Sequence, residues 1–137
     1  MASKYIVADG GRMVIEKWAG NVSSSEIVEH EKAQCMDPSI AQGAVVIVDI
    51  RQAIFPEATP ESSRNFASLL AQPDNREKFS RFALLVSGKV WETAKVLESE
   101  TEKLGVRIIA FTDVHVACTW LGLETEKILK GLDSIDI

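Results

Sequence analysis

The stretch GAVVIVDIR, residues 43–51, decides the fold. Val45 to Val48 form an unbroken run of β-branched side chains, which is typical of a strand covered on both of its faces. The run ends at Asp49, and Arg51 follows two residues later. A strand that is buried on both faces needs other layers above and below it. This stretch therefore predicts an α/β protein with a largely parallel sheet.

Two more strands of the same kind follow along the chain, FALLVSG at residues 82–88 and VRIIAF at residues 106–111. Helical patterns separate and follow these strands, at residues 60–72, 89–105 and 113–132. Strands that alternate with helices require crossover connections, which predict parallel pairing. The segment PDNREK, residues 73–78, is interpreted as a turn-rich linker. The last helix is either continuous or divided at Gly122.

The N-terminal segment KYIVADGGRMVIEKWAG, residues 4–20, has the pattern of a β-hairpin. Asp9, Gly10 and Gly11 supply its turn, because glycine tolerates positive φ and Asp-Gly suits tight hairpins. Alternation along residues 13–18 indicates that one face of the second strand is partly exposed to water. The hairpin is expected to add an antiparallel edge to the sheet.

A helix with a capping box follows the hairpin, in the segment SSSEIVEHEKAQCMDP, residues 23–38. Ser23 can accept a hydrogen bond from the backbone amide of Glu26, and the Glu26 side chain can reach back. Pro38 ends the helix. His30 lies between two glutamates, and we interpret it as part of a solvent-exposed helix face.

Composition and charge bound the function. The chain has 137 residues, so we expect one domain over residues 1–137. Fifteen basic against twenty acidic residues give a net charge of -5, which argues against nucleic acid as a partner. No apolar run approaches the ~20 residues of a transmembrane helix, and the N-terminus lacks the apolar core of a signal peptide. We expect a cytoplasmic protein.

Neither a metal site nor a cofactor is expected. The two cysteines, Cys35 and Cys118, have no metal-like or C-x-x-C spacing, and we interpret them as buried thiols. VSGKVWET lacks the first glycine and the Ser or Thr of a P-loop, and no G-x-S-x-G motif is present. We therefore predict no catalytic residue.

Polar residues follow all three buried strands. In open α/β sheets, ligands bind outside the carboxyl ends of parallel strands, and the amides of the following helices favour an anion there. This rule predicts a ligand site at one edge of the sheet. A structural role is the alternative for each residue, and Asp113 in particular suits a helix N-cap. The candidate ligand-binding residues are Asp49, Arg51, Ser87, Lys89 and Asp113.

Together these segments resemble the SpoIIAA-like, or STAS-like, fold, and the resemblance covers most of the chain. The closing segment RIIAFTDVHVACTWL is similar to the strand, turn and helix that close STAS domains. WAG at residues 18–20, D-x-R at residues 49–51 and the terminal F-T-D…A…W-L resemble an uncharacterised bacterial branch of this superfamily more closely. The resemblance implies a single-domain fold with a mixed, mostly parallel sheet, a hairpin at one side and helices packed on it.

The resemblance also implies a function. STAS domains of anti-sigma-factor antagonists are non-enzymatic switches, phosphorylated on a serine at the start of the second main helix. Asp49 matches that family, whereas Arg51 replaces its hydroxyl residue. Ser62 and Ser63 lie near the corresponding helix start, and Arg64 stands where the family has glycine. The superfamily is also similar in fold to lipid-binding CRAL-TRIO domains, which implies an apolar pocket.

We therefore expect a non-enzymatic, cytoplasmic binding or regulatory module. The alternative is a protein that binds a small anionic or lipid-like molecule, or an enzyme, at the carboxyl edge of the sheet. In a third hypothesis, the loop after Asp49 carries Phe55 and Pro56 on a surface for self-association or a protein partner.

Overall fold

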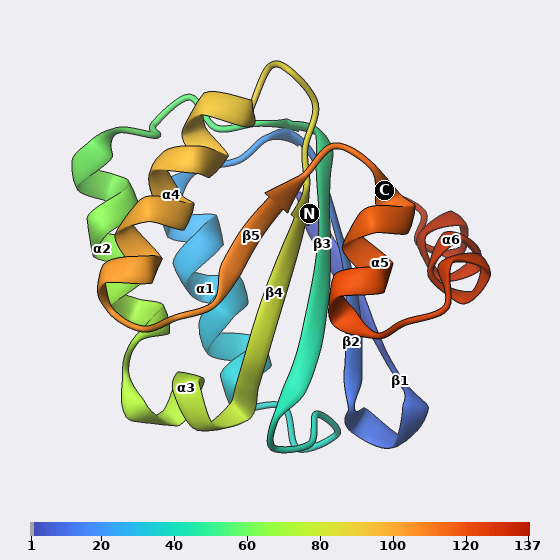
Figure 1. Ribbon diagram of the computed structural model, residues 1–137. Coiled ribbons are helices and arrows are strands. Elements are labelled where there is room, and N and C mark those ends of the chain that lie inside the picture. The colour runs from blue at the N-terminus through green and yellow to red at the C-terminus, as the bar shows by residue number, and fades with distance from the viewer. Residues whose placement is uncertain (1) are drawn as a thin grey trace.

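The computed structural model describes residues 2–137 as one five-stranded sheet between two layers of helices (Figure 1). The strands lie in chain order, and only the first is antiparallel to its neighbour. The predicted α/β class, the mostly parallel sheet and the antiparallel edge are thereby confirmed. The strands are β1 (Ser3–Ala8), β2 (Met13–Asn21), β3 (Ala44–Ile54), β4 (Phe79–Leu85) and β5 (Ile108–Phe111), and the helices are α1 (Ser24–Cys35), α2 (Pro60–Leu70), α3 (Pro73–Lys78), α4 (Trp91–Lys103), α5 (Val114–Leu121) and α6 (Thr125–Ser134).

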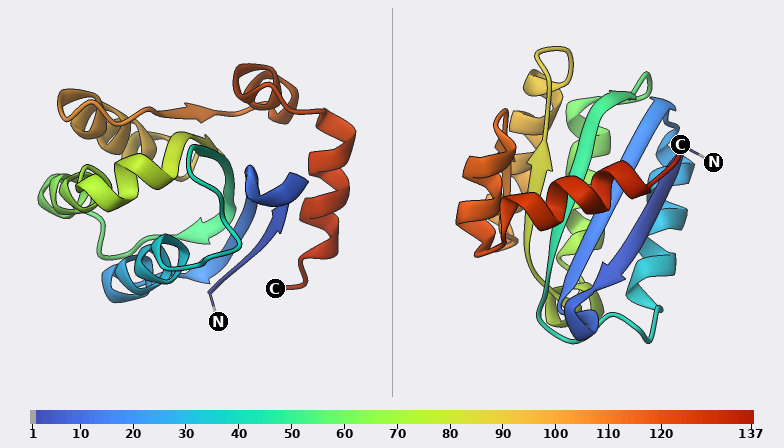
Figure 2. Two further views of the ribbon diagram at one scale, coloured as in Figure 1. Left: turned by 90° about the horizontal axis from the view of Figure 1, so that it is seen from below. Right: turned by 90° about the vertical axis from the view of Figure 1, so that its right-hand side faces the viewer.

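The helices that connect parallel strands all lie on one face of the sheet (Figure 2). Crossovers of one hand that always lead to the next strand place their helices on the same side, which accounts for α1, α2 and α4. The opposite face is left to the end of the chain, and α5 and α6 cover it. The two faces therefore have separate cores.

Alternation along β3 divides its side chains between these cores. Val46, Val48 and Ile50 face α1, α2 and α4, whereas Ile47 packs with α5 and α6 on the other face. The second core is closely packed at Gly131 of α6. A Cβ added there would lie 2.5 Å from the terminal carbon of Ile15 in β2. A larger residue at this position would require the Ile15 side chain to move.

The carboxyl end of β3 differs from the expected one. β3 does not end at Asp49 but continues to Ile54, because its pairing with β2 resumes after a register shift and runs to Asn21. Arg51 and Gln52 are exposed on this extension, so their polarity resembled the end of a strand. The prediction that this strand ends at Asp49 is therefore wrong.

Two helix predictions also need correction or completion. Residues 73–78 form α3 and not a linker, since Pro73 is tolerated in the first turn of a helix. The last helical segment is two helices, because α5 ends at Gly122 with a left-handed φ of 75°. The capping box of Ser23 and Glu26 at α1 is confirmed.

Among residues 2–137, no helix has the length and apolar character needed to cross a membrane.

Candidate functional site

A cavity of about 410 Å³ lies between the sheet and helices α1, α2 and α4. Its size is within the range of small-molecule sites, which are commonly about 300–1,000 Å³. Most of its wall is apolar and comes from all three helices, from β2 to β5 and from the loop after β3. The apolar lining includes Trp18, Val22, Ile27, Val48, Ile50, Phe55, Phe66, Leu70, Phe82, Leu84, Val90, Ala94, Leu97 and Ile108.

Helix α1 has a polar inner face beyond its first turn. Ile27, Glu31 and Gln34 follow one another at helical spacing, and both polar residues are buried. A helix that covers a sheet normally presents an apolar stripe to it. Here the stripe stops after one turn, so large apolar side chains are missing where α1 faces β2.

A buried hydrogen-bond network joins α1 to the first two strands. Glu16 accepts from Trp18 Nε1 at 2.6 Å on one oxygen and from Gln34 Nε2 at 2.5 Å on the other. His30 Nε2 lies 3.0 Å from the same oxygen as Gln34, and Ser3 Oγ lies 2.8 Å from His30 Nδ1. His30 Nε2 also lies 2.8 Å from Gln34 Nε2, so the side chains of His30, Gln34 and Glu16 meet at one point.

One expectation from the sequence is wrong at this network. The His30 side chain is only 8% exposed and packs 4.6 Å from the Trp18 ring, so it does not lie on a solvent-exposed helix face. Glu16 is 6% exposed, so the partly exposed face of β2 is the one that carries Lys17. The network buries the polar groups of both elements together.

Glu31 is the second carboxyl of the cavity. It is 5% exposed, and no protein group hydrogen-bonds to its Oε1 among the described residues. Burial, reinforced by the nearby charge of Glu16, raises the pKa of Glu31 to about 8. At neutral pH, Glu31 is therefore mostly a neutral acid. Gln34 Oε1, which is also buried, has no partner either.

The charged groups in the cavity wall are all acidic. Glu16 and Glu31 are buried, whereas Glu57 is exposed, next to the N-terminus of α1. None of the described lining residues is Lys, Arg or His. An anion would therefore meet only negative or neutral groups here, whereas unpaired acceptors favour a ligand that donates hydrogen bonds.

The structure joins three of the five residues predicted at the carboxyl edge. Arg51 donates to both oxygens of Asp49, at 2.9 and 2.8 Å, and Asp49 is buried. Ser87 Oγ lies 3.4 Å from the backbone oxygen of Arg51. These hydrogen bonds to Asp49 raise the pKa of Arg51 above its usual value. The charge of the Arg51 guanidinium is thus already balanced by Asp49 on the same strand.

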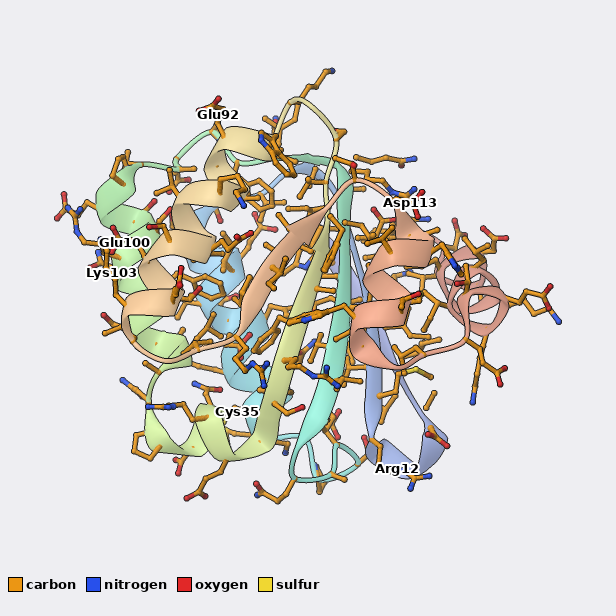
Figure 3. All side chains as sticks on the ribbon, viewed as in Figure 1. Arg12, Cys35, Glu92, Glu100, Lys103 and Asp113 are labelled. Carbon is orange, nitrogen blue, oxygen red and sulfur yellow. The ribbon has the colours of Figure 1, made fainter. Side chains whose placement is uncertain are left out.

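The other two residues lie outside that cluster. Lys89 is exposed in the turn before α4, and Asp113 Oδ1 accepts from the amide of Val116 at 3.0 Å (Figure 3). The N-cap role considered for Asp113 is confirmed. Helices α4 and α5 lie on opposite faces of the sheet, so Lys89 and Asp113 precede helices on different sides of it. None of these five residues lines the cavity.

The serines considered for phosphorylation lie in the cavity wall. Ser62 forms a capping box with Thr59 at the start of α2, and Ser63 is buried. A kinase could reach Ser63 only if the first turn of α2 opened. Phe55, in the loop after β3, is half-buried and lines the same cavity. The exposed apolar residues next to it are Ile54, at the end of β3, and Pro56 in the loop.

Arg51→Ala is expected to lower the free energy of unfolding by about 1–3 kcal/mol, because it leaves the buried Asp49 carboxylate without two hydrogen bonds. Urea unfolding at neutral pH measures the change. Lys89→Ala, which removes an exposed cation, is the control and should change stability by less than about 0.5 kcal/mol. Equal effects of the two substitutions would contradict a structural role for the Asp49–Arg51 pair.

Among residues 2–137, no group of three or more His, Cys, Asp or Glu side chains is arranged to hold a metal ion. Cys118 is buried as expected, and Cys35 is half-buried at the end of α1 (Figure 3). Burial raises the pKa of both thiols.

Sequence reasoning missed Glu16, Glu31 and Gln34, although each leaves a signal. Glu16 shares one face of a strand with Val14 and Trp18, where an apolar residue is expected. Glu31 and Gln34 occupy positions of α1 that continue the face of Ile27. A polar residue at a position that the periodicity assigns to the core is the signal for all three.

The comparisons with known proteins concern the fold. Neither a protein-family model nor a curated protein matches the chain. The structure is similar to that of an uncharacterised protein of the DUF3478 family from Shewanella loihica PV-4, described as having a SpoIIAA-like fold. The TM-score is 0.56 at 13% identity, over 87% of this chain and 93% of the other. The resemblance inferred from the sequence is thereby confirmed, and this chain has a SpoIIAA-like fold.

Proposed function

We propose that this protein is a non-enzymatic binding module that holds a small, mostly apolar molecule between its sheet and helices α1, α2 and α4. The observation that carries the proposal is the cavity of about 410 Å³ with its apolar wall and its buried carboxyl pair. The proposal includes no bond-making step. Regulation would follow if ligand binding changed the positions of α1, α2 and α4 and thereby the surface that a protein partner contacts.

The energetics of packing support an occupant. Protein interiors contain few voids larger than a water molecule, and unfilled core volume costs about 24 cal/mol per Å³. Water is a poor occupant, because a buried water needs polar partners and most of this wall has none. A ligand with an apolar body would remove that cost.

The cavity also has an entrance and a depth. Glu57 and Asn65 are exposed lining residues, in the loop after β3 and on α2, whereas Glu31 is buried. Glu57 lies next to Ser24 at the start of α1. Seven residues separate Ser24 from Glu31, which corresponds to about 10 Å along a helix. This depth suits an elongated molecule whose far end reaches the carboxyls.

Filling the cavity tests the proposal. Decanol should raise the melting temperature of the unchanged protein. Ala94 is buried in the wall on α4, so Ala94→Phe should occupy the space and abolish that rise. Ala71→Phe makes the same change outside the cavity, at the end of α2, and should keep the rise. Circular dichroism checks that both variants fold.

Ala94→Leu is a milder variant in case the phenyl ring prevents folding, and it should weaken decanol binding in calorimetry. Decanol binding that is unchanged in a folded Ala94 variant would place the ligand elsewhere. Absence of decanol binding to the unchanged protein would also contradict the proposed function.

A further inference from the structure

The inner face of α1 holds two buried acceptors that no protein donor satisfies among residues 2–137. They are Glu31 Oε1 and Gln34 Oε1, and both residues are more than nine-tenths buried. Buried polar atoms in proteins are nearly always paired, so unpaired ones require an explanation. Glu31 lines the cavity, which makes a ligand donor the natural partner for its free oxygen.

The neighbouring carboxyl determines the charge that this donor should carry. Glu16 accepts hydrogen bonds from Trp18 and Gln34, which fix it on the facing strand, and its charge is near enough to raise the pKa of Glu31. A carboxylate ligand would add a further acid to an acidic site. An alcohol could donate one hydrogen bond, but it would leave the acidic pair uncompensated. A cation with N–H groups meets both requirements.

We propose that the cavity binds an amphiphile with a protonated primary amine, whose ammonium group lies at Glu31 and Glu16 and whose apolar body extends toward Glu57. This inference rests on the proposed function and names the ligand class. The Trp18 ring also lines the cavity, and an aromatic ring face adds to the attraction of a desolvated cation. The ligand therefore needs a compact head with N–H donors.

Proton balance follows from the state of Glu31. Its neighbours with titratable groups are Glu16 on β2 and Cys35 one turn further along α1, and His30 holds the far side of Glu16. Because the pKa of Glu31 is about 8, the free protein carries a proton there at neutral pH. When the ammonium binds, Glu31 releases that proton to solvent, and a carboxylate–ammonium pair remains.

The head-group test compares decylamine, decanol and decanoate, which share one apolar chain. Isothermal titration calorimetry should give the tightest binding for decylamine, with decanol weaker by at least about tenfold and decanoate weaker still at neutral pH. In buffers of different ionisation enthalpy, decylamine should release about one proton near pH 6 and almost none above about pH 9. Decyltrimethylammonium, which lacks N–H donors, should bind more weakly than decylamine.

Two matched variants locate the head group. Glu31→Gln should weaken decylamine by at least about tenfold and eliminate the proton release, while decanol binding changes by less than about twofold. Glu57→Gln removes the carboxyl of the exposed end and should leave both ligands nearly unchanged. The two substitutions are chemically identical and differ only in their depth in the cavity.

The outcomes separate this inference from the proposed function. If all three decyl compounds bind with equal affinity and Ala94→Phe blocks them, the cavity binds apolar molecules but the amine head is wrong. Preference for decanoate, or loss of decylamine binding in Glu57→Gln but not in Glu31→Gln, would also overturn the inference. If none of the compounds binds, the proposed function itself fails.

Discussion

Glu31→Gln is expected to make the protein more stable at about pH 9, by on the order of 2–4 kcal/mol, and to change stability little at about pH 5. The folded protein has a Glu31 pKa of about 8, against 4.5 for a glutamate in water. Between these values the folded state keeps a proton that the unfolded state has released. Stability of the unchanged protein therefore falls as pH rises from about 4.5 to 8. Glutamine cannot ionise, so it removes this loss.

Urea unfolding at several values between about pH 5 and pH 9 measures the effect. Glu57→Gln is the control, because the same change at an exposed position should shift stability by a similar small amount at every pH. Tyr5, with a pKa raised to about 12, and Asp37, with one lowered to about 2, act outside this window. Parallel curves for Glu31→Gln and the unchanged protein would contradict the buried neutral acid.

Glu16→Ala should be the most destabilising single change on the cavity side, at about 3–5 kcal/mol. The carboxylate accepts from Trp18 and Gln34, with His30 Nε2 3.0 Å away, and alanine would leave the two buried donors unpaired. Glu16→Gln should fall between alanine and the unchanged protein, since its amide keeps one acceptor but turns an NH₂ group toward donors.

Urea unfolding near pH 7 measures this loss as well. Glu29→Ala, at an exposed position of α1, is the matched control and should change stability by less than about 0.5 kcal/mol. The charge of Glu16 helps to raise the pKa of Glu31, so Glu16→Ala should also move the pH dependence of unfolding to lower pH. An effect of Glu16→Ala below about 1 kcal/mol would mean that the network contributes little to the fold.

Local patterns predicted the fold because they agree with one another. The β-branched run at residues 45–48, the hairpin turn at residues 9–11 and the capped start of α1 each specify one element, and their order specifies the sheet. The errors lie where local and tertiary signals conflict. β3 continues through exposed polar residues because β2 still pairs with it there, and no local pattern reveals that pairing.

The candidate site was harder to predict because it is built between elements. The rule that ligands bind at the carboxyl ends of parallel strands led to Asp49 and Arg51, which form an ion pair with each other. The cavity instead is lined by residues from three helices and four strands, and the sequence shows only that Glu31 and Gln34 interrupt an apolar stripe. Their partner Glu16 is distant in sequence, so neither half of the cluster indicates the other.

The chain-order arrangement of the strands has a consequence for synthesis on the ribosome. Each strand can pair with its predecessor soon after it emerges, because no strand waits for a later one to fill a gap in the sheet. The face covered by α5 and α6 has no such early partner. Its apolar side chains stay uncovered until the last two helices appear, which makes the nascent chain prone to aggregation until then. These residues are Met13, Ile15, Ile47, Ala83 and Leu85.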